Sequence, residues 1–285
     1  MEITASILAF IATVGFSVTV LLVAGSTKKI GAIPTMFLWQ FFGIPMFLFL
    51  LPIAPLHMDS FHPLPIMGIG ACFSFIYLLF LYSTKIGSLP VVSTVNELFM
   101  VVTTILGVLL LGETLTPWKL TGMLMTLLGI TLIGFKLPTR KKTSLSLLAG
   151  VPYALASAIG TGVYLFATAI ASRTDGWFIT ALFIRIGIAL AMFGTLVYRR
   201  YNFSSLKKSA PWKILFTAAA IDVAAFSLYN YTIAEYEVST PTIITASQAA
   251  IIALLSWKFL KEKLNRQQLL GLLVVLCGLV SLQLQ

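Results

Sequence analysis

Three charged side chains stand inside long apolar stretches of this sequence: Glu97, Asp222 and Arg185. A charged group is costly in an apolar environment, so such residues usually face a cavity or a partner and are candidates for function. Glu97 lies about seven residues, or roughly 10 Å of helix, into its stretch, with Asn96 beside it. For this pair we favour a substrate or proton site over a structural carboxylate that is protonated or hydrogen-bonded between helices.

Asp222 lies near the middle of a later stretch, and Phe226 and Tyr229 share its face at helical spacing. Arg185 lies at a similar depth in the preceding stretch. One interpretation is an ion pair that holds two helices together. In the other, Arg185 binds a substrate carboxylate and Asp222 binds a proton or an ammonium group. The sequence leaves both interpretations open.

Aromatic side chains with a polar end need a partner when they are buried, which makes Tyr229 and Trp39 further candidates. Trp39 is followed by Gln40, which is also polar at depth. Gln248 is the last candidate, and the argument for it depends on an internal repeat described below. The candidate substrate-binding residues are Glu97, Asn96, Gln248, Asp222, Arg185, Tyr229 and Trp39.

No grouping typical of an enzyme occurs in the sequence. His57 and His62 are close together in a link between apolar stretches, and their spacing is only a weak metal signal. There is no serine–histidine arrangement and no phosphate-binding loop, so we expect neither catalysis nor ATP drive. We also expect no metal and no cofactor.

The composition indicates that this chain lies in a membrane rather than in water. Of its 285 residues 59% are apolar and only 10% are charged, where a soluble domain has roughly 25% charged residues. The partner implied is the lipid bilayer. The net charge of +10 could suggest nucleic acid, but the basic residues cluster in short links, so we expect no nucleic-acid partner.

Ten stretches are long and apolar enough to cross a membrane as helices, which need about 20 residues. They cover roughly residues 3–25, 33–53, 64–84, 91–111, 117–135, 146–171, 177–198, 211–234, 241–260 and 266–284. The first has no basic start and no small-residue cleavage pattern, so we expect a retained span rather than a removed signal peptide. The fold class predicted is an all-α membrane protein with ten transmembrane helices.

A constant spacing of 149 residues relates two parts of the chain. It separates Gly122 from Gly271 and Gly129 from Gly278, and it separates two loop carboxylates, Glu113 and Glu262, for which we expect mainly structural roles. Such a repeat indicates two copies of one unit. We expect a first five-helix repeat at 1–140 and a second at 141–285, integrated into one transport domain.

An odd number of spans per copy reverses the second copy, so the two repeats must be inverted. Inverted repeats are typical of secondary transporters, which bind substrate between the halves. The alternative is a receptor or scaffold without solute flux. Aligning Pro90 with Pro241 places Glu97 opposite Gln248 and Asn96 opposite Ser247, after a two-residue slip from the common spacing. This alignment makes Gln248 a candidate.

The basic residues predict the orientation. Sixteen of the nineteen lie in one set of links, two in the opposite set, and Arg185 lies inside a span. Basic loops face the cytoplasm. We therefore expect a multi-pass protein of the cell membrane with its termini outside.

The sequence resembles the EamA-like branch of the drug/metabolite transporter superfamily over essentially its whole length. The matching pieces are Gly112-Glu113-Thr114-Leu115 with Gly122 and Gly129, Lys261-Glu262-Lys263-Leu264 with Gly271 and Gly278, Leu81-Tyr82-Ser83-Thr84, and Leu228-Tyr229-Asn230-Tyr231-Thr232.

This resemblance implies a secondary carrier of small metabolites, often an exporter of amino acids or related compounds, with a cavity lined by both halves. Proton coupling is one option. The chain departs from the family in two respects: the common Trp-Gly signature is missing from its first span, and the family's usual description puts the termini in the cytoplasm.

Overall fold

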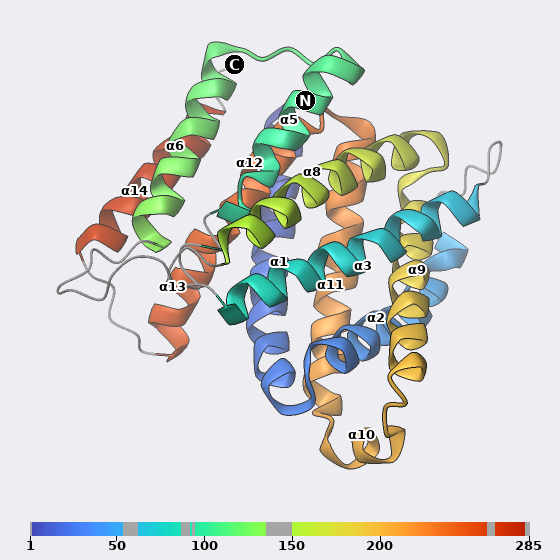
Figure 1. The fold of residues 1–285 in the computed structure, drawn as a ribbon. Helices are drawn as coiled ribbons and strands as arrows, with labels where there is room; N and C mark the ends of the chain where they lie inside the picture. Colours follow the sequence, from blue (N-terminus) through green and yellow to red (C-terminus); the bar gives the residue numbers. More distant parts are fainter. Residues whose placement is uncertain are drawn as a thin grey trace.

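The structure is a computed structural model that describes residues 2–53, 62–86, 92, 95–134, 150–260 and 266–282. In these ranges the chain is helical, with connecting turns and no strand (Figure 1). The α-helices are α1 (Glu2–Ile30), α2 (Ala32–Leu50), α3 (Pro63–Ile86), α5 (Phe99–Leu111), α6 (Pro117–Gly134), α8 (Val151–Thr174), α9 (Trp177–Tyr198), α10 (Phe203–Ser209), α11 (Trp212–Glu235), α12 (Ser239–Ala246), α13 (Gln248–Leu260) and α14 (Arg266–Ser281).

The apolar helices correspond to the expected spans. Six of them are long and apolar enough to cross a membrane, and four shorter apolar segments accompany them in the described part of the chain. Two of the expected spans, 91–111 and 241–260, are not straight single helices. The second is divided into α12 and α13, and in the first a turn at residues 97–98 separates the helical residues 95–96 from α5.

The repeat is visible in the helix bounds. The first residues of α1 and α8, of α3 and α11, of α5 and α13, and of α6 and α14 are all separated by the repeat spacing found in the sequence. In two of these pairs, α3 with α11 and α5 with α13, the last residues keep that spacing as well. The second helices, α2 and α9, start closer together than this because α1, at 29 residues, is longer than α8, at 24 residues.

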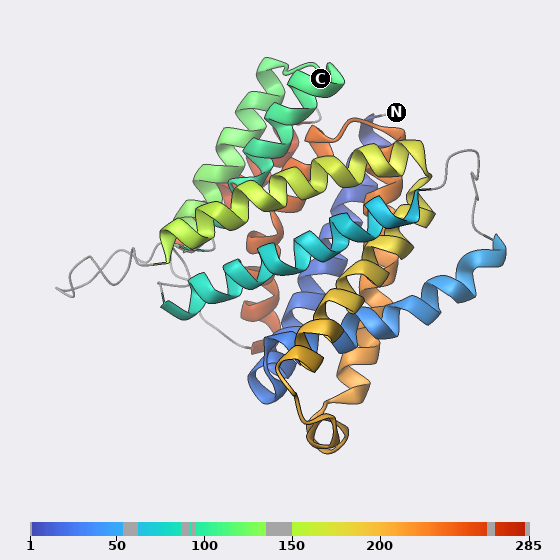
Figure 2. The same cartoon turned by 45° about the vertical axis from the view of Figure 1, so that its right-hand side comes forward.

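Matching glycines join α6 to α14. A Cβ on Gly122 would lie 2.9 Å from the carbonyl oxygen of Gly278, and a Cβ on Gly278 would lie 2.9 Å from that of Gly122. Gly129 and Gly271 show the same reciprocal approach, at 2.6 and 2.7 Å. The two helices therefore run antiparallel about a local two-fold axis, as inverted repeats require. They lie side by side at one flank of the bundle (Figures 1 and 2).

Two equivalent spans are broken at the same place. The N–H of Leu98 donates to Val95, and the carbonyl of Leu98 accepts from Val101 and Val102. The same three hydrogen bonds recur at the equivalent positions of the second repeat, with Ser247 in place of Leu98.

The repeat thus keeps its spacing through both breaks. It places Glu97 opposite Ala246 and Gln248 opposite Phe99, so the two-residue slip that paired Glu97 with Gln248 was wrong. Pro241, one of the two prolines that suggested the slip, precedes the residues whose hydrogen bonds set the register.

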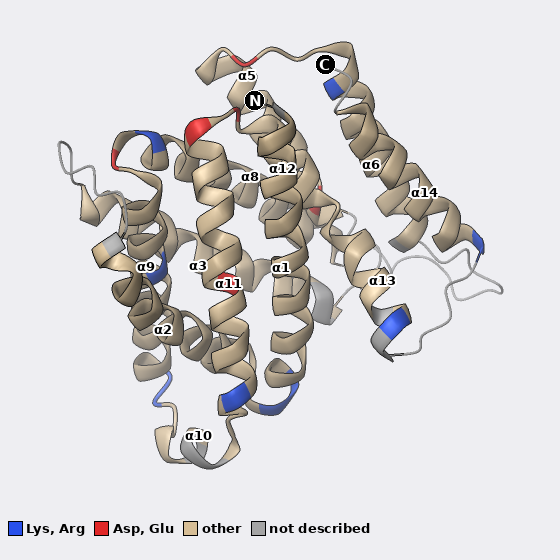
Figure 3. Ribbon diagram, turned by 180° about the vertical axis from the view of Figure 1, so that it is seen from behind, with Lys and Arg blue, Asp and Glu red and all other residues tan. Residues whose placement is uncertain are grey.

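Charges separate along the bundle. Figure 3 shows most Lys and Arg toward the end that carries α10, and most Asp and Glu toward the opposite end. We call this second end the terminal face, because α1 begins there and α14 ends there (Figure 1).

Candidate functional site

A cavity of about 200 Å³ lies at the centre of the bundle between the two halves. Its walls come from α1, α2 and α3 of the first half and from α8, α9, α11, α12 and α13 of the second half. Seven of its lining side chains are aromatic, and two of these, Phe73 and Tyr164, stack with their ring centroids 4.0 Å apart. The cavity is therefore apolar over most of its wall, with few polar groups.

Arg185 and Asp222 bring opposite charges to this wall. Nη2 of Arg185 lies 2.5 Å from Oδ2 of Asp222, and both side chains are buried. The pair uses only one end of the guanidinium. Nε and Nη1 of Arg185 are buried and have no hydrogen-bond partner among the described residues. A charge pair with spare buried donors is more costly than a fully satisfied one, which suits a site that meets a ligand better than a purely structural contact.

Two aromatic rings and a glycine pack closely around the guanidinium of Arg185. Its carbon Cζ lies 5.4 Å from the ring centroid of Phe47 and 5.9 Å from that of Phe226. On α2, Gly43 leaves the space that the guanidinium fills, because a Cβ there would lie 2.8 Å from Cδ and Cζ of Arg185. Aromatic faces attract a cation, so both rings stabilise the charge of Arg185.

Five of the seven sequence-derived candidates meet at this cavity: Trp39, Arg185, Asp222, Tyr229 and Gln248 all line it. Their helices are far apart in the chain, from α2 to α13, so only the fold brings them together.

The remaining two candidates, Asn96 and Glu97, are not in the cavity lining. They lie at the helix break before α5, where Oδ1 of Asn96 and Oε2 of Glu97 are buried without a hydrogen-bond partner among the described residues.

The break between α12 and α13 opens onto the cavity. Thr245 and Gln248, on either side of Ser247, both line it. Irregular backbone at membrane depth is tolerated only where protein or a cavity surrounds it, so the break and the cavity belong together. Thr245 was missed from the sequence. The one available signal was the repeat spacing, which places it opposite Asn96.

A hydroxyl pair holds one cavity wall. The hydroxyl of Thr242 donates to the carbonyl of Val238 at 2.7 Å, which leaves its oxygen free to accept from Tyr229 at 3.1 Å. Tyr229 is therefore fixed by α12, and the position of α12 sets the shape of the cavity.

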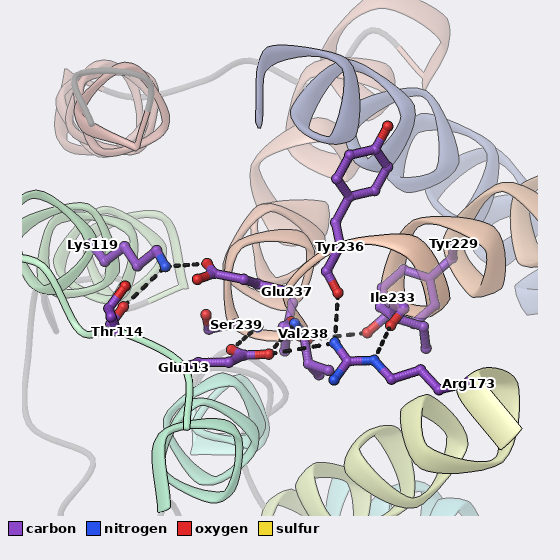
Figure 4. A network of polar contacts seen from close by, with 11 residues as sticks. Glu113, Thr114, Lys119, Arg173, Tyr229, Ile233, Tyr236, Glu237, Val238 and Ser239 are labelled. Carbon is purple, nitrogen blue, oxygen red and sulfur yellow. Dashed lines mark hydrogen bonds and ion pairs between the residues drawn. The ribbon is translucent and has the colours of Figure 1, made fainter. Parts of the chain in front are cut away.

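Polar contacts gather at the terminal face around Glu113 (Figure 4). Its Oε1 accepts from the N–H of Val238 at 2.5 Å and its Oε2 accepts from the N–H of Ser239 at 3.0 Å. A carboxylate of the first half thus satisfies the free N–H groups where α12 of the second half begins. The sequence predicted a mainly structural role for Glu113, but it gave no sign of this contact between the halves.

Two basic residues complete this network. Lys119 of α6, only 1% exposed, donates to the carbonyl of Thr114 at 3.0 Å and forms an ion pair with Glu237. Arg173 of α8 donates to the carbonyls of Ile233 at 3.2 Å and Tyr236 at 2.6 Å. Its Nη2 also lies 3.7 Å from Oε1 of Glu113. Glu262, the repeat counterpart of Glu113, is outside the described residues.

A second cavity, of about 540 Å³, adjoins the network and is lined by Ala5, Glu113, Arg173 and Glu237 among others. Elsewhere, Nδ1 of His62 lies 3.1 Å from Oδ1 of Asp175. Across the described ranges no group of three or more His, Cys, Asp or Glu side chains is placed to hold a metal ion. His57 is outside those ranges.

Comparisons with known proteins agree with this architecture. A crystal structure described only as "Crystal structure of protein" matches with a TM-score of 0.81 and 18% identity, over 99% of this chain and 96% of that chain. At this identity the likeness concerns the fold alone. None of the curated proteins compared with the chain matches it. The model of the EamA-like transporter family matches twice, at residues 3–135 and 148–283. The chain therefore belongs to the EamA-like transporter family, whose members are membrane transporters.

Proposed function

We propose that this protein is a secondary active transporter that moves a small polar or amphipathic metabolite by alternating access. The observation that carries the proposal is the central cavity, which is lined by both repeats and contains a buried charge pair and a broken helix. Substrate sites of transporters with inverted repeats lie at such an interface, often at discontinuous helices.

The proposed solute is an amino acid or a related metabolite. A cavity of about 200 Å³ suits one small solute. A zwitterion would keep the site neutral overall, with its carboxylate toward Arg185 and its ammonium toward Asp222. The aromatic wall would contact the apolar part of the same molecule.

Asn96 and Glu97 have a place in this proposal through the repeat. Asn96 is the counterpart of Thr245, which lines the cavity beside the second break. When inverted halves exchange conformations, the first break takes the position of the second. Asn96 would then line the cavity of the oppositely facing state, with Glu97 next to it in the chain. There Oδ1 of Asn96 and Oε2 of Glu97, which have no hydrogen-bond partner among the residues described here, would meet solute or a proton.

Localisation and direction extend the proposal. The protein would reside in the cell membrane with its basic loops in the cytoplasm and the terminal face outside. Export of the metabolite is the direction that the family resemblance favours, and coupling to a proton gradient is one option for driving it.

Counterflow in proteoliposomes tests the transport function. Vesicles loaded with one unlabelled compound from a panel of amino acids, amines, sugars and nucleotides should accumulate the labelled form of that compound. Protein-free vesicles and the Arg185→Gln variant serve as controls. Saturable binding of a panel member without any counterflow would support the receptor alternative and contradict transport.

The proton part is tested separately with Glu97→Gln and Asp222→Asn. If proton coupling depends on these carboxylates, both variants should flatten the dependence of flux on the pH difference across the membrane. An unchanged pH dependence in both variants would end the carboxylate hypothesis while leaving transport itself standing.

A further inference from the structure

We propose that Glu113 and Lys119 of the first half, with Glu237 and the start of α12 of the second half, form a latch that closes the cavity at the terminal face. The proposal rests on the transport function above, because a latch has meaning only if the two halves move apart. It assigns a role to the Gly112-Glu113 motif that the cavity itself does not use.

The latch consists of contacts between the halves. The Glu113 carboxylate accepts two backbone N–H groups at the start of α12, at 2.5 and 3.0 Å. The ammonium of Lys119, in α6, forms an ion pair with Glu237, which lies two residues before the same helix (Figure 4). Two segments of the first half therefore contact one segment of the second half, residues 237–239.

The position of Glu113 is set by backbone geometry. Gly112 ends α5 in the left-handed region with φ +68°, which turns the chain sharply, and the N–H of Glu113 returns to the carbonyl of Gly107 at 3.2 Å. The carboxylate is thereby held against its own helix end and aimed across the interface. The positive end of the α12 dipole adds to the attraction.

The latch is connected to the cavity through α12. This helix has eight residues, which corresponds to about 12 Å at 1.5 Å per residue. Its first residues are held by Glu113, its middle residue Thr242 accepts from Tyr229, and Thr245 near its end lines the cavity. Because α12 ends at the Ser247 break, it can change its orientation while α13 stays in place.

The chemistry of these contacts suits a reversible closure. When the latch opens, water can replace each partner of the two N–H groups, the ammonium and the carboxylates, so the contact can break and form again. The glycine crossing of α6 with α14 also joins the halves, but it depends on close backbone packing that water cannot replace. The latch is therefore the contact that opens, and the α6–α14 crossing is the contact that persists.

Cysteine accessibility tests the latch without any substrate. A reporter Thr245→Cys is placed in a background where Cys72 and Cys277, both exposed, are replaced by Ser. A membrane-impermeant methanethiosulfonate reagent is applied to either side of the membrane in separate preparations. The exposed Leu115 beside the latch, changed to Cys in a parallel protein, shows which side is the terminal face.

Glu113→Gln and Lys119→Met should each raise the labelling rate of the reporter from the terminal face by about 10-fold or more, since a hydrogen bond to a charged group is worth at least such a factor. The matched control is Glu235→Gln, which neutralises an exposed glutamate at the same end outside the network. It should leave the labelling rate unchanged.

A charge exchange between Lys119 and Glu237 distinguishes an opened latch from a misfolded protein. Lys119→Glu alone should open the latch, and adding Glu237→Lys should return labelling toward that of the parent, with each protein checked for a monodisperse elution profile. Unchanged labelling in folded Glu113→Gln and Lys119→Met, or an equal increase in Glu235→Gln, would overturn the latch. Neither result would touch the counterflow test of transport.

Discussion

Arg185 and Asp222 face one another from neighbouring helices, with Nη2 of the arginine 2.5 Å from Oδ2 of the aspartate, and both side chains are buried midway along α9 and α11. Removing one partner of a buried ion pair leaves an uncompensated charge and costs about 3–5 kcal/mol. We expect Asp222→Asn and Arg185→Gln each to lower the midpoint of thermal unfolding in detergent, and the double variant to regain part of it.

Counterflow in the double variant decides between the two roles of this pair. Recovered stability without flux would place the pair in the transport site. Recovery of both would make it a structural contact. Single variants as stable as the parent would contradict the buried pair altogether.

Gly43→Ala should disturb the site from outside the cavity. The added Cβ would overlap the Arg185 guanidinium, so the arginine side chain must shift, and we expect its contact with Asp222 to change. Overpacking of this kind costs about 1–3 kcal/mol, and we expect reduced flux with a folded protein. Gly194→Ala, where nothing lies within 4 Å of the new Cβ, is the control and should transport normally. Equal flux in both variants would contradict the role given to Gly43.

The α6–α14 crossing should tolerate no Cβ. In Gly129→Ala and in Gly271→Ala the new atom would lie 2.6 and 2.7 Å from the facing carbonyl oxygen, so the helices must separate. Both variants should lower the unfolding temperature by similar amounts, because the repeat makes the two sites equivalent. Gly25→Ala, with open space around it, provides the comparison. A large effect in only one of the pair would argue against the local two-fold axis.

The Tyr229–Thr242 contact predicts an order of effects. Tyr229→Phe removes a donor and leaves the Thr242 oxygen without that partner, which should cost about 0.5–1.5 kcal/mol. Thr242→Val should cost more, about 1–3 kcal/mol, because the buried tyrosine hydroxyl is then left unpaired. Chemical or thermal unfolding of the two variants gives the comparison. The reverse order would show that the tyrosine hydroxyl has another acceptor.

Topology is checked directly. With the basic links in the cytoplasm, tags fused to either terminus should react with impermeant reagents in intact cells, and a tag in the link around residues 136–145 should not. The opposite pattern would invert the orientation and place the latch on the cytoplasmic side.

The sequence by itself determined the membrane fold and the repeat. A chain with 59% apolar residues can satisfy its backbone in a bilayer only as helices, and the constant repeat spacing with five spans per copy requires inversion. The helix bounds keep that spacing closely, from Pro63 with Trp212 to Phe99 with Gln248. These features follow from hydropathy and register, which are properties of the chain alone.

Only the tertiary structure decided which polar residues meet. Arg185 and Asp222 are 37 positions apart, and their 2.5 Å contact depends on how α9 and α11 rotate against each other. The breaks at Leu98 and Ser247 occur where neither proline nor glycine signals them, since they depend on local hydrogen bonding to the third preceding residue. The contact from Glu113 to the start of α12 likewise crosses 125 positions. Side-chain direction and helix packing, which the linear pattern does not encode, place these groups together.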